Sequence, residues 1–280
     1  MRLNNTYLLF DTGQTAKRED WVEAHAAILK AIRSMRWPDE GGGHTFRIPR
    51  IVTLRPGSEY IDANGKTKVV KGKENQKGKT LRNGVGPLRD QFRRWMGKTG
   101  WICEEPCSLA PFFKKLRESS AVAFTKFPMP TAEELEEAKV EALNESVGDF
   151  DFWFQTKSDF RTVVEWETGN ISSSHRSLNK MCLALMGGVV DAGVLIVPSK
   201  FMYPHLTDRI GNIRELQPYF YFWNRVGTLV DRGLLSVVEV EHDELFKSTD
   251  LRDFISMGTD GNSKKKAVPT RRRGRSTKER

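Results

Sequence analysis

The order of elements that the sequence predicts is that of an α/β fold, and three patterns carry this prediction. Residues 149–154 and 162–167 each alternate acidic with apolar residues, which is typical of a half-buried strand. The chain then turns into a helix with apolar side chains at three- and four-residue spacing between Leu178 and Leu185. Residues 192–198 are a short apolar run, which is typical of a buried strand. We therefore expect two strands, a helix and a third strand in that order.

The N-terminal third of the chain is expected to supply a helix and then a basic β-hairpin. Apolar residues recur at helical spacing from Trp21 to Met35, so we expect an amphipathic helix that ends before Pro38. Residues 51–70 are typical of a hairpin that turns at Asn64-Gly65, and a lysine-rich polar stretch follows. We interpret residues 51–82 as an inserted basic hairpin, whose lysines fit either a phosphate contact or a solvated loop.

Two further segments resemble known local motifs. Gly72 and Gly78-Lys79-Thr80 imitate a phosphate-binding P-loop, but five residues separate the two glycines where the motif needs four. We therefore expect no nucleotide cofactor. Thr131 and Glu134 form a capping box, which predicts a helical insertion at about residues 123–146.

The chain has 280 residues, of which 38% are hydrophobic, and this composition is that of an ordinary globular protein. A chain of this length can bury a hydrophobic core without the help of disulfides. The three cysteines are an odd number with no paired spacing and lack the second pair of ligands that a zinc site needs, so we expect reduced thiols in the cytoplasm. The apolar run Val189–Val197 is interrupted by Asp191 and Gly193, so we expect no membrane partner.

Most of the net charge of +9 lies at the C-terminus. Residues 263–280 contain nine basic residues against the single acidic residue Glu279, whereas residues 1–262 are nearly neutral. Such a segment cannot form a hydrophobic core, so we expect a disordered basic tail. The tail fits either polyanion binding or simple solubilisation.

Asp151, Glu165 and Glu167 are the candidate metal-binding carboxylates. If the two acidic strands are neighbours, Asp151 lies near Glu165, and strand alternation places Glu165 and Glu167 on one face. Carboxylates on one face repel each other unless a cation binds there, and oxygen ligands suit Mg²⁺. The alternative is a solvated strand face, because an isolated E-x-E pattern is common.

The segment from Glu165 to Lys180, EWETGNISSSHRSLNK, is specific enough to indicate a family. It resembles the active-site strand and recognition helix of the BamHI-like type II restriction endonucleases. The similarity continues in residues 206–212, 215–220 and 258–263, and with weaker matches upstream it extends over most of the chain. The resemblance implies an α/β, restriction-endonuclease-like fold of the PD-(D/E)xK type, with a mixed central β-sheet flanked by helices on both faces.

The activity that the resemblance implies is Mg²⁺-dependent hydrolysis of phosphodiester bonds in double-stranded DNA, by two ions about 4 Å apart. Glu167 is then the candidate general base. The metal ligands carry over as Asp151, Glu165 and Glu104, and the neighbours Asp149 and Glu105 stay open as alternatives to Asp151 and Glu104.

The resemblance also implies which residues read the DNA. Arginine pairs with guanine, aspartate accepts a hydrogen bond from cytosine, and asparagine pairs with adenine, so these residue types suit a G·C-rich site. Because all five candidate residues match the reading residues of the family in type, the resemblance implies the palindrome 5′-GGATCC-3′. For Asn170 and Ser172, the alternative to a base contact is capping of the helix. For Asp208 and Arg209, the alternative is an ion pair at the protein surface. The base-contacting residues of the family correspond to Asn170, Ser172, Arg176, Asp208 and Arg209, and its minor-groove segment corresponds to Gly258, Thr259, Asp260 and Gly261.

We expect residues 1–262 to form a single endonuclease domain that works as a homodimer, because a palindrome is read by two symmetric subunits. The charged pairing groups of the family's dimer helices are absent at residues 186–188 and at Tyr221, so the subunit contacts must differ. Two other functions fit the same residues. One is a sequence-specific DNA-binding protein that has lost cleavage, and the other is an endonuclease with a related but different site.

Overall fold

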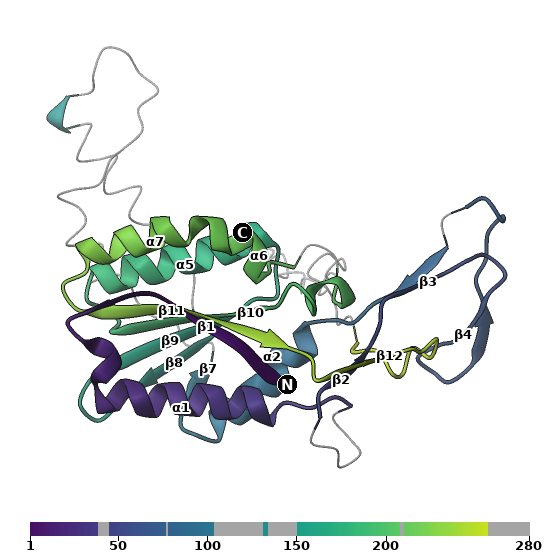
Figure 1. Cartoon of the computed structure of the whole chain (residues 1–280), viewed down its shortest axis with the longest axis horizontal. Helices are drawn as coiled ribbons and strands as arrows, with labels where there is room; N and C mark the ends of the chain where they lie inside the picture. The colour runs from purple at the N-terminus through teal and green to yellow at the C-terminus, as the bar shows by residue number, and fades with distance from the viewer. Residues whose placement is uncertain (39–44, 77, 104–130, 134–149, 208–209, 257–280) are drawn as a thin grey trace, which may run out of the picture.

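The central feature of the fold is a six-stranded mixed β-sheet (Figure 1). The computed structural model describes residues 1–38, 45–76, 78–103, 131–133, 150–207 and 210–256. In spatial order the strands are β1 (Arg2–Thr12), β11 (Gly233–Glu241), β10 (Ala192–Pro198), β9 (Arg161–Trp166), β8 (Phe152–Gln155) and β7 (Ile102–Cys103).

The middle of the sheet is parallel and its edges are antiparallel. β10 runs parallel to both β9 and β11, with Leu195 opposite Glu165. β8 pairs antiparallel with β9, and β1 pairs antiparallel with β11. The expected strand at residues 192–198 is therefore confirmed, whereas the strand expected at residues 149–154 begins only at Phe152.

Helices cover both faces of the sheet, as the fold class requires (Figure 1). Adjacent residues of one strand point to opposite faces, so Val164 packs with the helices on one face and Val163 with those on the other. Each face therefore has its own hydrophobic core. The helices are α1 (Glu19–Ser34) and α2 (Gly86–Gly97) on one face and α5 (Ile171–Met186), α6 (Ile213–Leu216) and α7 (Phe220–Val226) on the other, with short 3-10 turns η1 (Thr15–Lys17), η2 (Tyr203–His205), η3 (Gln217–Tyr219) and η4 (Gly227–Leu229).

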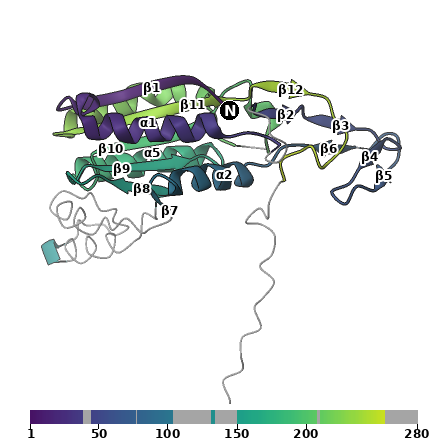
Figure 2. The same ribbon diagram turned by 90° about the horizontal axis from the view of Figure 1, so that it is seen from below.

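A β lobe, residues 50–82, projects beyond one end of the sheet in both views (Figures 1 and 2). The expected turn is confirmed, because β4 (Glu59–Ile61) and β5 (Thr67–Val69) form a hairpin that closes at Asp62–Gly65. Its outer strands are β3 (Val52–Leu54) and β6 (Lys79–Leu81), so Lys79 and Thr80 lie in a strand and not before a helix. At the base of the lobe, β2 (Arg47–Pro49) pairs in parallel with β12 (Glu244–Phe246).

Several expectations fall on residues that lie outside the described part of the chain. These are the helical insertion at 123–146, apart from residues 131–133, and the basic tail at 263–280. Across the described ranges, the structure contains no helix with the length and apolar character needed to cross a membrane.

Candidate active site

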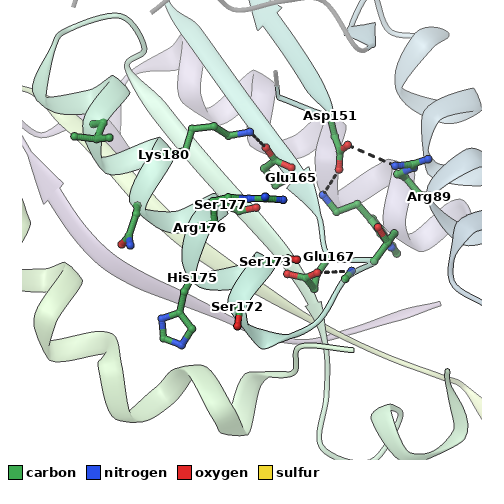
Figure 3. A pocket seen from close by; sticks show the side chains of 15 residues that line it. Arg89, Asp151, Glu165, Glu167, Ser172, Ser173, His175, Arg176, Ser177 and Lys180 are labelled. Atoms are coloured by element: carbon green, nitrogen blue, oxygen red, sulfur yellow. Dashed lines mark hydrogen bonds and ion pairs between the residues drawn. The ribbon is translucent and has the colours of Figure 1, made fainter. Parts of the chain in front are cut away.

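A cleft of about 870 Å³ lies where β9 ends and α5 begins (Figure 3). Its walls come from four places in the sequence: α2, the residue before β8, the end of β9 with the loop that follows, and one face of α5. Asp151, Glu165 and Glu167 all line this cleft, so the structure brings together the three candidate carboxylates that it describes.

Glu165 and Asp151 are held next to each other by the pairing of β8 with β9. Glu165 lies near the end of β9 and is 8% exposed, in a strand whose neighbours on both sides are paired. Asp151 Oδ2 accepts a hydrogen bond of 3.0 Å from the backbone N–H of Trp166, the residue after Glu165. This bond fixes Asp151 at the edge of β8 with its side chain in the cleft.

Two cations from the surrounding helices reach the same carboxylates (Figure 3). The ammonium group of Lys180 forms an ion pair with Glu165 Oε1 and lies 4.3 Å from the centre of the Phe150 ring. Arg89 Nη1 lies 3.8 Å from Asp151 Oδ1. Neither cation was predicted from the sequence. A signal for Lys180 was available, since Ser172, Arg176 and Lys180 are four residues apart and so share one face of α5.

Glu167 is buried, at 5% exposure, in the loop between β9 and α5. Its Oε1 accepts a hydrogen bond of 2.5 Å from Gly169 N–H, and its Oε2 accepts one from the Ser174 hydroxyl. A Cβ at position 169 would lie 2.6 Å from Ser173 Oγ, so the close approach requires glycine. The carboxylate is therefore fixed in orientation by its own loop and by the first turns of α5.

Burial raises the pKa of both glutamates. Loss of solvent raises the pKa of Glu165 to about 7, a rise that Lys180 opposes and the negative charge of Asp151 reinforces. Loss of solvent likewise raises the pKa of Glu167 to about 7, against the opposing hydrogen bonds from Ser174 and Gly169. The cleft therefore disfavours further negative charge even though Lys180 is present.

The oxygen donors in the cleft fit a magnesium ion. Mg²⁺ commonly binds to one or two carboxylates and completes its coordination with water and substrate phosphate. Asp151 and Glu165 supply two such carboxylates. In the ranges described by the structure, no three His, Cys, Asp or Glu side chains are grouped as a metal site, and Glu104 and Glu105 lie outside those ranges.

The N-terminal half of α5 forms the opposite wall of the cleft. Ser172 and Arg176 are exposed and line the cleft. Asn170 is exposed too, and its side chain caps α5 by accepting a hydrogen bond of 3.2 Å from Ser173 N–H, so the capping role considered for Asn170 is observed. The chain at Ile210 forms a bridge with Asn170, which ties the segment after residue 209 to the start of α5.

Seven of the expected site residues are not among those that the structure describes. Asp208 and Arg209 separate the described segments that end at Thr207 and begin at Ile210. The others are Glu104, Gly258, Thr259, Asp260 and Gly261, and the alternatives Asp149 and Glu105 also lie outside the described ranges.

Comparison with known proteins shows the family. Residues 1–262 match the family model described as restriction endonuclease BamHI. The type II restriction enzyme OkrAI of Oceanobacter kriegii is 36% identical over 179 residues, which are 64% of this chain and 73% of that enzyme. The type II restriction enzyme BamHI of Bacillus amyloliquefaciens is 50% identical over 60 residues, 21% of this chain and 28% of that enzyme.

Among solved structures, the chain is similar to restriction endonuclease BglII complexed with a DNA 16-mer. The TM-score is 0.46 at 12% sequence identity, over 87% of this chain and 79% of that one. The family match and the mixed sheet with helices on both faces confirm the expected restriction-endonuclease-like fold. The chain therefore belongs to the BamHI family of type II restriction endonucleases and is a site-specific deoxyribonuclease.

Proposed function

We propose that this enzyme cleaves double-stranded DNA at 5′-GGATCC-3′ with Mg²⁺, and that residues 1–262 form the catalytic domain of a homodimer. The observation that carries the proposal is the convergence of two sets of residues on one cleft. Asp151, Glu165 and Glu167 line one wall, and Ser172 and Arg176 project from the other. A DNA strand in this cleft has its phosphate beside the carboxylates and its base edges beside α5.

Asp151 and Glu165 would hold the metal ion, with Glu104 as the third ligand that the family resemblance implies. When bound, Mg²⁺ supplies positive charge that stabilises the charge developing on the phosphate during hydrolysis. Asp151 keeps its position through the Trp166 backbone N–H. Lys180 keeps Glu165 in place and offsets part of its negative charge.

Glu167 is proposed as the general base that accepts a proton from the attacking water. Two hydrogen bonds, from Gly169 N–H and the Ser174 hydroxyl, orient its carboxylate. A carboxylate has about four acceptor sites, so roughly two are left to bind water. Its pKa of about 7 suits a base that operates near neutral pH, because catalysis is most efficient when the two values match.

Sequence readout is proposed to come from the N-terminal face of α5 and from the segment before Ile210. All five residue types that the family uses are present, at Asn170, Ser172, Arg176, Asp208 and Arg209. A good bidentate contact is worth about 1 to 3 kcal/mol of discrimination. Arg176→Ala should therefore relax selection at one guanine position while leaving the carboxylates in place.

A homodimer is supported by the exposed aromatic surface of α7 and the turn before it. Tyr219, Tyr221 and Phe222 are 50%, 75% and 58% exposed, and aromatic residues are enriched at protein interfaces. A second subunit covering this surface would place two clefts about a twofold axis, as a palindrome requires. Tyr221→Glu with Phe222→Glu should then yield monomers in analytical ultracentrifugation, and an unchanged dimer would place the interface elsewhere.

The proposed specificity is tested with short duplexes that contain GGATCC or a site with one substituted base pair. With Mg²⁺ we expect cleavage of the GGATCC duplex and loss of cleavage on each substituted duplex. With Ca²⁺, which binds oxygen ligands at longer distance, we expect binding without cleavage. Cleavage after complete chelation would contradict the metal mechanism, and preference for a substituted duplex would contradict the assigned site.

A further inference from the structure

The β lobe (residues 50–82) is a braced projection with a small core of its own. Leu54, Val70 and Leu81 are buried together with Phe254, which comes from the chain after β12. Backbone hydrogen bonds tie that returning chain to β4, from Ile61 N–H to Thr249 O at 3.1 Å and from Leu251 N–H to Ile61 O at 2.9 Å. The lobe therefore holds a fixed shape beyond the sheet (Figures 1 and 2).

The lobe carries the excess positive charge of the catalytic domain. It contains nine Lys and Arg residues against three acidic residues, a formal charge of +6, whereas the rest of residues 1–262 contains 27 basic and 32 acidic residues. Among residues that the structure describes, only Lys68 of the exposed lobe cations has a carboxylate within 4.0 Å, that of Asp62. These exposed cations are Arg50, Arg55, Lys66, Lys68, Lys71 and Lys73.

Asn83 joins the base of the lobe to the 3-10 turn η2 and precedes α2, the helix that contributes to the cleft. The Asn83 side chain is buried, and its Nδ2 donates hydrogen bonds to Pro49 O at 2.9 Å and to His205 O at 2.8 Å. His205 Nδ1 in turn accepts a hydrogen bond of 3.3 Å from Ile51 N–H. Three residues after Asn83 the chain enters α2, which brings Arg89 into the cleft beside Asp151. The lobe thus leaves the domain next to the cleft.

We propose that the β lobe binds the sugar-phosphate backbone of duplex DNA outside the recognition base pairs. This inference rests on the proposed function, since it needs DNA in the cleft. An extended chain rises about 3.3 Å per residue, so the chain from Ile51 to Asp62 reaches at most roughly 36 Å, about one turn of B-DNA. Exposed cations within that reach, of which Lys68 alone has a carboxylate partner among the described residues, suit phosphate, which they bind by releasing counterions without reading sequence.

The test is a lobe variant that replaces four cations, Lys66, Lys68, Lys71 and Lys73, with the neutral residue Gln, which lowers the formal charge of the lobe by four. All four side chains are exposed, so their removal leaves the lobe core unchanged. The matched control changes four exposed cations near α1 and the turn between β8 and β9, away from the cleft and the lobe. These are Lys17, Lys30, Arg33 and Lys157.

Binding is measured with Ca²⁺ over a series of salt concentrations, on a GGATCC duplex of about 12 base pairs and on one of about 40 base pairs. We expect the lobe variant to lose about tenfold or more in affinity on the long duplex, with a salt slope shallower by roughly 0.9 for each phosphate that it no longer neutralises. On the short duplex it should equal the wild type. The control variant should show a smaller loss that does not depend on duplex length.

Equal affinity of wild type and lobe variant on the long duplex, with equal salt slopes, would overturn the inference. A change in subunit association by the lobe variant, without an effect of duplex length, would show that the lobe contacts a second subunit and would equally overturn it. Cleavage of the short duplex by the wild type tests the proposed function separately, because the lobe is not expected to affect that duplex. Circular dichroism and thermal unfolding of both variants verify that they fold.

Discussion

Lys180 of α5 forms a buried ion pair with Glu165 of β9. The same helix carries Arg176 one turn earlier, on the face that lines the cleft. The pair therefore links the element expected to read DNA bases with the carboxylate expected to hold the metal ion. Its two members come from different elements, so the pair adds to the apolar packing that holds α5 against the sheet.

Replacing Lys180 by Met should destabilise the metal-free protein by about 3 to 5 kcal/mol near pH 8, the usual loss when one partner of a buried ion pair is removed. Near pH 6 the loss should be smaller, because Glu165, with its pKa already raised to about 7, is then mostly protonated and leaves no buried charge. Urea unfolding at both pH values measures this difference. Lys180→Arg keeps a cation and is the control, and an equal loss at both pH values would contradict the account.

Asp151→Asn should abolish cleavage while specific binding to GGATCC in Ca²⁺ is kept, because we propose that Asp151 acts on the phosphate and not on the base edges. The amide oxygen still accepts the Trp166 hydrogen bond, so the fold should be kept. Asp149→Asn is the matched control, two residues earlier in the same segment. If Asp149→Asn is inactive and Asp151→Asn is active, the assignment of the metal ligand is wrong.

The stability of the metal-free protein should fall as pH rises from about 4.5 to 7. A glutamate whose pKa is raised in the folded state keeps its proton longer there than in the unfolded chain, so deprotonation favours unfolding in that interval. For Glu167, with its pKa raised to about 7 from 4.5, the effect is roughly 3 kcal/mol. Glu167→Gln should flatten this dependence in urea unfolding, whereas Glu23→Gln, an exposed change on α1, should not. A stability that rises over the interval in wild type would contradict the burial argument.

Truncation after Ser263 should weaken non-specific DNA binding more than sequence preference. It removes nine basic residues and one acidic residue and leaves the cleft and the β lobe in place. For each phosphate that the shortened chain no longer neutralises, the salt slope becomes shallower by about 0.9. Fluorescence anisotropy on GGATCC and on random duplexes at several salt concentrations measures both effects. An unchanged salt slope would show that the tail does not contact DNA.

The parts of the fold that could be predicted are those with a continuous local pattern. β10 and α5 follow directly from an apolar run and from helical spacing. The edge of the sheet could not be predicted in this way. The buried Glu239 of β11 is stabilised by hydrogen bonds from Asn5 and Tyr7 of β1, more than 200 residues away in the chain. No local pattern marks such an acidic residue as part of a buried strand.

The same limit applies to the candidate site: residues with a local pattern could be predicted, and contacts that depend on tertiary packing could not. The carboxylates were found because strand alternation is local, and Asp151 was placed beside Glu165 because two neighbouring strands pair. The counter-cations were not found. Lys180 and Arg89 reach the carboxylates from helices on different faces of the sheet, a contact that depends on tertiary packing and that strand periodicity does not encode.

We propose that this endonuclease is specific for GGATCC, and sequencing the ends of its DNA fragments is the most direct test of that specificity. Purified protein is incubated with a plasmid of known sequence and Mg²⁺, and every fragment end is mapped. We expect all ends to fall within GGATCC, and to carry GATC overhangs if the cut lies after the first guanine, as the family resemblance implies. Ends that map to any other sequence would contradict the proposed specificity.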